Sequence, residues 1–300
     1  MTQTTIAAAP PFIRPDRGDR GWPAYVLPAL LVALALTIYP VGSLIWTSLT
    51  KQGFDGNSFV GLDNYFALFR MPRFSLIVGN TVVWTLGTTI GAIVLGCIAA
   101  LALQHKRVVL PGLWRSLLLL PWIVPQVASA TIWKWFYSTE FGFLNHMLMQ
   151  VGIIGQPVSW LTQPEIVMGA VATIQIWGTF PFVMLMVSAG LQTVDESVLE
   201  AARLDGATPW QEFVDIILPS LRGVLFIVSL IVVVWALNSF TTIWVMTQGG
   251  PAGRTSIFSI YIYESFRNFD LNRSAAASVL LLVVSLIFAV AYMLRIGKQR

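Results

Sequence analysis

Six long stretches without a formal charge dominate this chain of 300 residues. They cover residues 21–50, 74–105, 116–133, 166–194, 223–253 and 274–294, so each is at least 18 residues long. A helix that crosses the hydrocarbon core of a bilayer needs about 20 apolar residues, with about 17 as the lower limit. Because backbone groups in lipid must hydrogen-bond to one another, these stretches are expected to be helices.

The charge-free stretches predict an all-α integral membrane protein with six transmembrane helices. The spans are expected near residues 24–48, 77–103, 114–136, 166–190, 222–246 and 274–295. Residues 21–300 then form a single transmembrane domain, and residues 1–20 form a cytoplasmic tail. A further stretch without charge, 141–164, is interrupted by glycines, amides and a proline, which predicts a short interfacial helix over 143–151 followed by a loop.

The composition excludes several classes of protein. Hydrophobic residues make up 56% of the chain and charged residues 11%, whereas a soluble domain carries about 25% charged residues. An ordinary soluble enzyme and a disordered chain are therefore excluded. The basic residues are scattered, so the net charge of +4 does not indicate a nucleic-acid partner. Cys97 is the single cysteine, which excludes an internal disulfide and a metal site built from several cysteines.

The connecting segments on the two sides of the predicted membrane differ in positive charge. The set that includes both termini holds 11 of the 18 Lys and Arg residues, and the other set holds 7. Cytoplasmic segments of membrane proteins carry the excess of cations. Six spans with both termini cytoplasmic fit this rule, whereas seven spans would place the basic residues after Leu294 outside the cell.

The connection between the fourth and fifth predicted spans, residues 193–219, is rich in acidic residues. It holds six of the fourteen acids and falls on the cytoplasmic side. Thr193 and Thr208 each stand three residues before a Glu or Gln, which is the spacing of a capping box at a helix start. Gly206 lies between them and suits the left-handed turn that ends a helix. The pattern predicts two helices joined at Gly206, although composition alone equally allows a solvated amphipathic connector.

The residues around Gly206 form a longer motif. The string from Glu200 to Ala207 reads Glu-Ala-Ala-Arg-Leu-Asp-Gly-Ala, and Leu218-Pro219 follows it. This string resembles the EAA motif in the permease subunits of ATP-binding-cassette (ABC) importers. The resemblance covers about twenty positions, which makes it far more specific than a short motif.

Other segments are similar to the carbohydrate-uptake branch of that family. They include Phe59-Val60-Gly61-Leu62-Asp63-Asn64-Tyr65 before the second span and Thr247-Gln248-Gly249-Gly250-Pro251 after the fifth. The chain departs from the usual residues of the branch at Thr241 and Gln248. The resemblance thus indicates a sugar importer and leaves the particular sugar open.

The resemblance implies an ABC type I importer permease fold, a set of partners and a location. In the family, the EAA loop is a coupling helix that sits in a groove of the ATP-binding subunit. The coupling residues implied here are Glu200, Ala201, Ala202, Asp205, Gly206 and Ala207. The partners implied are a second, homologous permease chain, two ATP-binding subunits and an extracytoplasmic solute-binding protein. The chain itself is then a non-catalytic, multi-pass subunit of the bacterial inner membrane, surrounded by lipid, and its partner ATPase uses the ATP and magnesium.

Polar and aromatic residues within the predicted spans are candidates for the cargo pathway. Polar residues are costly inside a membrane, and sugars stack on aromatic rings and bind amides and hydroxyls. The candidates are Gln175, Trp177, Asn238, Phe240, Thr241 and Trp244. Pro181 marks a place where the fourth span is expected to break and expose backbone to a cavity. The predicted spans carry no cation deep in the membrane, which favours a neutral saccharide over glycerol phosphate or a sulfonated sugar.

Two other classes of function compete with an importer permease. An ion-coupled secondary transporter normally needs ionisable groups within its spans, and these spans carry almost none. An intramembrane enzyme needs a nucleophile with a base, or metal ligands, and the two histidines lie far apart in the predicted topology. The sequence also contains no ATP-binding P-loop motif, so an importer permease would require a separate ATPase chain.

Overall fold

The computed structural model describes residues 22–53, 56–105 and 107–297. The predicted cytoplasmic tail, residues 1–20, lies outside the described residues. In chain order, the elements are α1 (Trp22–Ser48), β1 (Thr50–Gly53), β2 (Gly56–Phe59), α2 (Asp63–Phe69), α3 (Phe74–Gln104), α4 (Pro111–Ile123), α5 (Gln126–Phe136), α6 (Phe143–Gln150), α7 (Val167–Leu191), α8 (Glu196–Leu204), α9 (Pro209–Gln211), the π-helix η1 (Glu212–Ile217), α10 (Leu218–Ser220), α11 (Arg222–Leu237), α12 (Thr241–Thr247), α13 (Phe258–Arg267) and α14 (Leu271–Gly297).

Among the described residues, four helices are long and apolar enough to cross a membrane. They are α1, α3, α7 and α14. Two bent helix pairs raise the number to six if each pair forms one span, by length and composition. The first pair is α4 with α5, bent by 96°, and the second joins Pro209–Ser220 to α11, bent by 68°. The chain is thus mostly helical, as predicted, and the short hairpin β1–β2 is an addition that the charge pattern does not predict.

The third and fifth predicted spans are not continuous helices. The span expected over 114–136 is interrupted at Val124, whose ψ of 129° is extended because Pro125 disfavours a helical residue before it. The span expected over 222–246 is interrupted between α11 and α12, where Phe240 has a φ of −133°. The prediction of a break at Pro181 is wrong, because α7 continues through that residue. Neighbouring helices in a bundle accommodate such prolines.

The centre of the fold is the packing of α3 against α7. Glycines on α3 allow the two backbones to approach closely, as small residues do in membrane bundles. A Cβ on Gly96 would lie 2.6 Å from Cβ of Val183 and 3.0 Å from the backbone nitrogen of Met184. A Cβ on Gly91 would lie 2.4 Å from Cδ1 of Ile176. The closely packed α3–α7 pair therefore forms the frame on which the remaining helices are placed.

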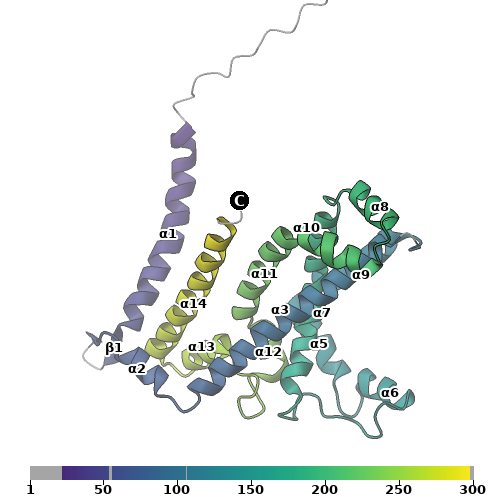
Figure 1. The fold of residues 1–300 in the computed structure, drawn as a ribbon. Helices are drawn as coiled ribbons and strands as arrows, with labels where there is room; N and C mark the ends of the chain where they lie inside the picture. Colours follow the sequence, from purple (N-terminus) through teal and green to yellow (C-terminus); the bar gives the residue numbers. More distant parts are fainter. Residues whose placement is uncertain (1–21, 54–55, 106, 298–300) are drawn as a thin grey trace, which may run out of the picture.

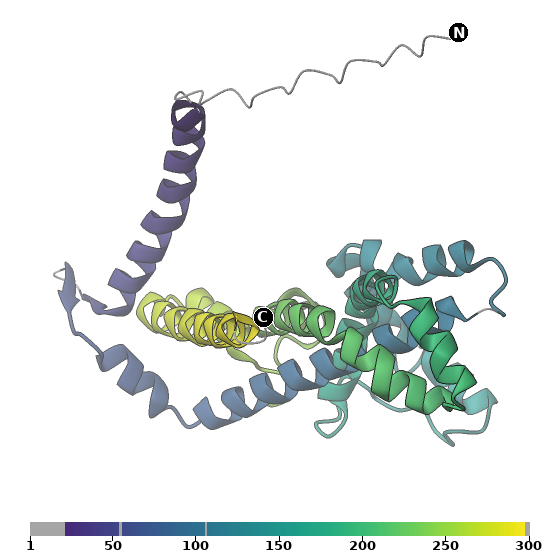
Figure 2. The same cartoon turned by 45° about the horizontal axis from the view of Figure 1, so that its top comes forward.

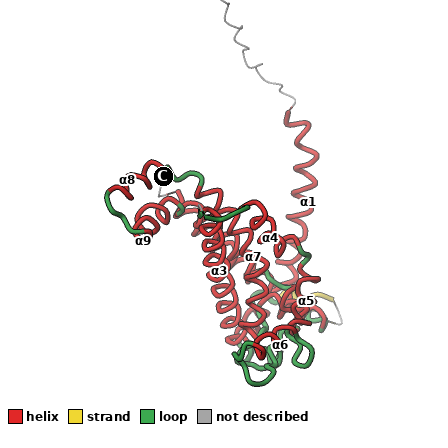
Figure 3. Tube along the Cα trace, turned by 90° about the vertical axis from the view of Figure 1, so that its right-hand side faces the viewer, coloured by secondary structure: helices red, strands yellow, loops and turns green. Residues whose placement is uncertain are grey.

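The elements fall at two ends of the molecule. Helices α8 and α9 lie at the same end as the first turn of α1 and the last turn of α14, and the hairpin, α2, α6 and α13 lie at the other (Figure 1). Helices α8 and α9 project sideways from the ends of the long helices (Figure 3). The short helix predicted over 143–151 is present as α6 and belongs to the opposite end. The 193–219 connection and both ends of the described chain are therefore on one side.

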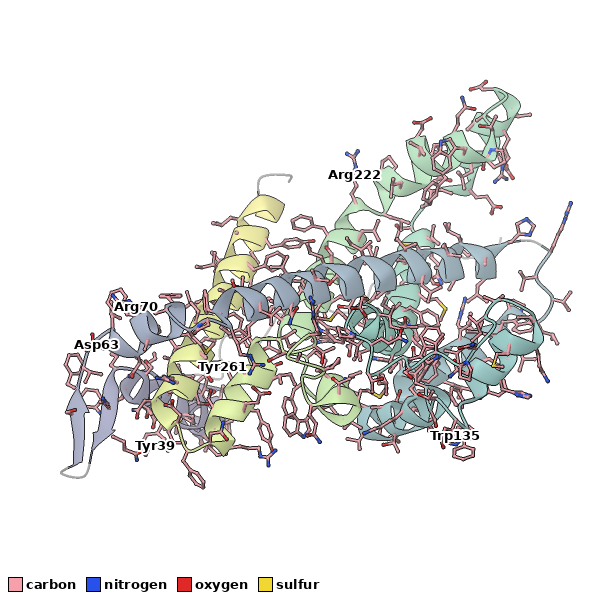
Figure 4. The ribbon with its side chains drawn as sticks, turned by 90° about the horizontal axis from the view of Figure 1, so that it is seen from below. Tyr39, Asp63, Arg70, Trp135, Arg222 and Tyr261 are labelled. Carbon is pink, nitrogen blue, oxygen red and sulfur yellow. The ribbon has the colours of Figure 1, made fainter. Side chains whose placement is uncertain are left out.

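Helix α1 stands at an angle to the other helices (Figure 2). It contacts α14 and β1, and its span is not buried within the chain. Figure 4 shows the opposite end from below, with Asp63 at the start of α2 on one side and Trp135 of α5 on the other. The apolar surface of α1 is thus left for contacts outside this chain.

Candidate functional site

The first candidate site is the bent segment between α7 and α11, here named the coupling element (residues 195–220). Asp195 caps the start of α8, since its carboxylate accepts a hydrogen bond from the backbone N–H of Ser197 at 2.9 Å. The helix start predicted at Thr193 is therefore two residues too early. The second predicted start is confirmed: Thr208 and Gln211 form a reciprocal capping box, with Pro209 at the first helical position.

Gly206 forms the bend of the coupling element. It has a φ of +86°, and nothing lies within 4 Å of the position that a Cβ would occupy. The N–H of Gly206 donates to the carbonyl of Arg203 at 3.1 Å, and the N–H of Ala207 donates to the carbonyl of Ala202 at 2.9 Å. These two bonds form a Schellman end for α8. Glycine is therefore required for its backbone conformation and not for lack of space.

An ion pair that spacing did not predict closes the bend. Arg203 on α8 donates two hydrogen bonds of 2.9 Å, from Nε and Nη2, to the two carboxylate oxygens of Glu212 on η1. These bonds hold the pKa of Glu212 below its ordinary value and raise the pKa of Arg203. The pair spans nine residues across a turn, so it does not follow helical spacing. The available signal was that Arg203 is the sole cation among the six acids from Asp195 to Asp215.

The outward surface of the coupling element combines acidic and apolar side chains. Glu200, Ala201 and Asp205 are exposed, and Ala202 and Ala207 are half-buried. Leu204 is 89% exposed and Trp210 is 70% exposed. A shallow pocket of about 320 Å³ lies at the bend, lined by Ala202, Asp205, Gly206, Ala207, Gln211, Asp215 and Ile216. Four of the six predicted coupling residues, Ala202, Asp205, Gly206 and Ala207, thus line this pocket, and the other two, Glu200 and Ala201, are exposed on α8 outside its lining.

The second candidate site is a cavity of about 430 Å³ within the helix bundle, here named the membrane cavity. It lies where the break between α4 and α5 faces α7 and the break between α11 and α12. Its lining residues are Pro121, Trp122, Val124, Gln126, Ser129, Ile174, Gln175, Gly178, Thr179, Trp235, Asn238, Ser239, Phe240, Thr241 and Thr242. Among the described residues that line it, none carries a charge. Non-helical backbone at membrane depth is tolerated where it lines a cavity of this kind.

Four of the six predicted pathway residues line the membrane cavity, namely Gln175, Asn238, Phe240 and Thr241. The amide oxygen of Gln175 accepts hydrogen bonds from Thr242 at 3.1 Å and from Ser239 at 3.5 Å. Its amide nitrogen lies 3.4 Å from the Thr179 hydroxyl. Gln175 is therefore bonded to side chains of two helices, whereas Asn238 is exposed and its amide nitrogen donates one turn back, to the carbonyl of Val234 at 2.9 Å.

The two tryptophans among the predicted pathway residues lie elsewhere. The ring of Trp177 packs edge-on against Trp133, with centroids 5.7 Å apart. Trp244 stacks on Phe240 at 5.6 Å and carries the guanidinium of Arg267 at the same distance over its ring. Both therefore take part in packing between side chains. Trp122 and Ser129 line the cavity instead, and their positions next to the Pro125 break were the available signal.

The sequence matches a known family over most of its length. Residues 92–299 match the model of the family described as "Binding-protein-dependent transport system inner membrane component". The chain belongs to this family. The matched range includes the coupling element and every residue that lines the membrane cavity. The chain is accordingly a membrane-spanning permease component of a binding-protein-dependent transport system.

Individual relatives and solved structures agree with this assignment. The chain is 33% identical to the trehalose/maltose transport system permease protein MalF of Thermococcus litoralis, over 92% of each chain. It is 32% identical to the sulfoquinovosyl glycerol transport system permease protein SmoG of Agrobacterium fabrum, over 93% of this chain and 91% of the relative. A bacterial ABC transporter that imports alginate contains a chain of the same fold, with a TM-score of 0.79 and 23% identity over 93% of this chain and 96% of that one.

Proposed function

We propose that this chain is one of two permease subunits of an ATP-driven importer that carries a neutral saccharide into the cell. The membrane cavity passes the saccharide, and the coupling element contacts a separate ATP-binding subunit on the cytoplasmic side. A solute-binding protein delivers the cargo to the opposite end, where the hairpin, α6 and α13 lie. The family assignment and the charge-free polar lining of the cavity carry this proposal.

The lining of the membrane cavity supports a neutral saccharide as cargo. Amides and hydroxyls from Gln126, Ser129, Asn238 and Thr241 match sugar hydroxyls, and Trp122 is one of three aromatic rings in the lining. A phosphate or sulfonate would need a cation to offset the cost of moving its charge out of water. Relatives named for trehalose and maltose and for lactose transport point the same way.

A sulfonated sugar is the second candidate for the cargo. The relative SmoG is named for sulfoquinovosyl glycerol transport and is nearly as similar as MalF. Such a cargo requires the second permease subunit to supply the positive charge. A screen of the cognate solute-binding protein with neutral and sulfonated sugars separates the two candidates.

The coupling element supports an ATPase as the partner on the cytoplasmic side. Its exposed acids and its apolar anchors, Leu204 and Trp210, form a surface suited to another protein rather than to water alone. The excess of cations in the segments on that side supports a cytoplasmic location. The coupling element also lies at the same end as the first turn of α1 and the last turn of α14 (Figure 1). ATP and magnesium would be bound by the partner.

Uptake by the reconstituted complex tests the proposal. The chain, its second permease subunit, the ATP-binding subunit and the cognate solute-binding protein are placed in vesicles with labelled trehalose, maltose, lactose, glycerol phosphate or a sulfonated sugar. We expect uptake of a neutral saccharide that requires both ATP and the binding protein. Uptake driven by a proton or sodium gradient without ATP would contradict the proposal and favour a secondary transporter.

A further inference from the structure

The break between α11 and α12 has no proline to cause it. In a continuous helix, the carbonyl of Ala236 would accept a hydrogen bond from the N–H of Phe240, four residues on. Here Phe240 has left the helical conformation, and the carbonyl of Ala236 accepts from Ser239 at 3.2 Å instead. In a membrane-embedded segment, altered backbone of this kind must be satisfied by other parts of the protein.

Side chains from two other helices bond to the carbonyls of this break. The indole N–H of Trp84 on α3 donates to the carbonyl of Ala236 at 3.2 Å. The hydroxyl of Ser259 on α13 donates to the carbonyl of Ser239. Trp84 is fully buried at 0% exposure, so its N–H has no access to water. A buried tryptophan N–H needs a partner, and here the partner is the carbonyl at the break.

The opposite side of the break is tied to α7. Gln175 accepts hydrogen bonds from Ser239 and Thr242, so it holds residues on both sides of Phe240. Side chains of three other helices, α3, α7 and α13, thus bond to one interrupted segment. The residues between these bonds, Asn238 and Thr241 among them, are those that line the membrane cavity.

We propose that Trp84 and Ser259 are positioning residues for the cargo pathway, which hold α11 and α12 apart so that Asn238 and Thr241 face the membrane cavity. This inference rests on the proposed function, since it assumes that the cavity carries the cargo. Neither residue lines the cavity, and each acts through a backbone carbonyl of the break. The frame formed by α3 and α7 supplies two of the three ties and so fixes where the break lies.

The variant Trp84→Phe tests the proposal, because it keeps an aromatic ring in the core and removes the N–H. In the assembled transporter, we expect the deuterium uptake of peptides over 234–244 to become about fivefold faster, the effect of one lost hydrogen bond to a buried carbonyl. The amount of saccharide imported per ATP hydrolysed falls by about the same factor, while ATP hydrolysis itself is retained. A general loss of folding would instead lower both activities together.

Matched variants separate positioning from simple damage. Trp135→Phe makes the same substitution at an exposed residue of α5. Thr88→Val removes a buried hydroxyl of α3 that donates a hydrogen bond one turn back along the same helix, to the carbonyl of Trp84. Both are expected to behave like the unsubstituted protein. Ser259→Ala is expected to reproduce the effect of Trp84→Phe, and Ser259→Thr, which keeps the hydroxyl, is expected to restore transport.

Two results would overturn the proposal. Unchanged exchange over 234–244 in both Trp84→Phe and Ser259→Ala would show that these residues do not hold the break. Faster exchange with an unchanged ratio of saccharide to ATP would show that the break does not position the cargo site. If the unsubstituted complex imports none of the saccharides, the proposed function fails instead, and the exchange measurement still decides whether the two residues hold the break.

Discussion

Single residues set the geometry of the coupling element. The two hydrogen bonds between Arg203 and Glu212 connect α8 to η1 across the bend. A guanidinium matches a carboxylate in a bidentate fork, which a lysine cannot do. The pair therefore fixes the angle between the two helices, as a coupling lever requires if it is to move as one body.

Loss of this ion pair is expected to uncouple transport from ATP hydrolysis. Arg203→Ala and Glu212→Gln lower saccharide import per ATP by about fivefold or more, the lower end of ordinary coupling energies. Arg203→Lys gives a smaller loss, because the charge remains and the fork does not. Uptake and ATP hydrolysis measured in the same vesicles check this, and equal losses in all three variants would contradict it.

The same pair predicts little dependence on pH near neutrality. The pKa of Glu212 is lowered in the folded protein, so the pair stabilises the fold above the ordinary glutamate value of 4.5 and is lost as the pH falls through the lowered value. Coupling should therefore stay constant across the neutral range. Saccharide import per ATP, measured as a function of pH, checks this. A loss of coupling in the unsubstituted protein at a pH still above the ordinary glutamate value would contradict the assignment.

If the membrane cavity carries the cargo, as proposed, Asn238 is the polar residue that we expect to contact it. It lies at the end of α11, is exposed to the cavity, and its amide nitrogen bonds to the carbonyl of Val234 at 2.9 Å. Asn238→Ala is expected to lower saccharide import about tenfold while ATP hydrolysis is retained, since an interaction with a sugar hydroxyl is lost. Trp177→Phe is a useful comparison, because Trp177 is absent from the lining and should change import little.

At the scale of elements, the bend between α8 and α9 requires a glycine at position 206 because of its backbone conformation, not because space is short. There is room for a side chain, but the φ of +86° disfavours most residues and above all β-branched ones. Gly206→Val is therefore expected to abolish import without preventing insertion, whereas Gly206→Asn retains most of it, because Asn tolerates the left-handed region. Import at equal membrane levels of the variants checks this. If Gly206→Val imports as much saccharide as Gly206→Asn, with both near the level of the unsubstituted protein, the bend is not needed for import.

The helices that could be predicted are those that need only an apolar stretch. The apolar stretches around α1, α3, α7 and α14 each form one continuous helix. Proline alone does not identify the breaks: Pro125 lies at the break between α4 and α5, but Pro181 lies inside the continuous α7, and no proline lies between α11 and α12. The break at Phe240 depends on Trp84, which lies more than a hundred residues earlier in the chain. Hydropathy cannot reveal such a contact.

The same limit applies to the candidate site. Polarity within an apolar stretch singled out Gln175 and Asn238, and both line the membrane cavity, because an amide in a membrane must face a partner or water. Tryptophan gives no such signal, since one ring type serves both packing and sugar contact. Trp177 and Trp244 therefore could not be separated from Trp122 before the fold was known.

At the scale of the whole molecule, the arrangement separates two working ends. The coupling element lies at one end, and the hairpin and α6 lie at the other (Figure 1). The membrane cavity is lined by residues of α4, α5, α7, α11 and α12. The α3–α7 frame runs between the ends, and the breaks beside it shape the cavity. If ATP binding by the partner moves the coupling element, as proposed, we expect the movement to be transmitted through α7 and α11, the helices that flank it in sequence.

The contact between the coupling element and the ATP-binding subunit is the most direct test of this account. A photo-crosslinking residue is placed at Ala201, which is exposed on α8, and as a control at Glu140, which is exposed at the opposite end. In intact membranes, we predict a crosslink from position 201 to the ATP-binding subunit and none from position 140. A crosslink from position 201 to the solute-binding protein, or labelling of that position from outside the cell, would contradict the account.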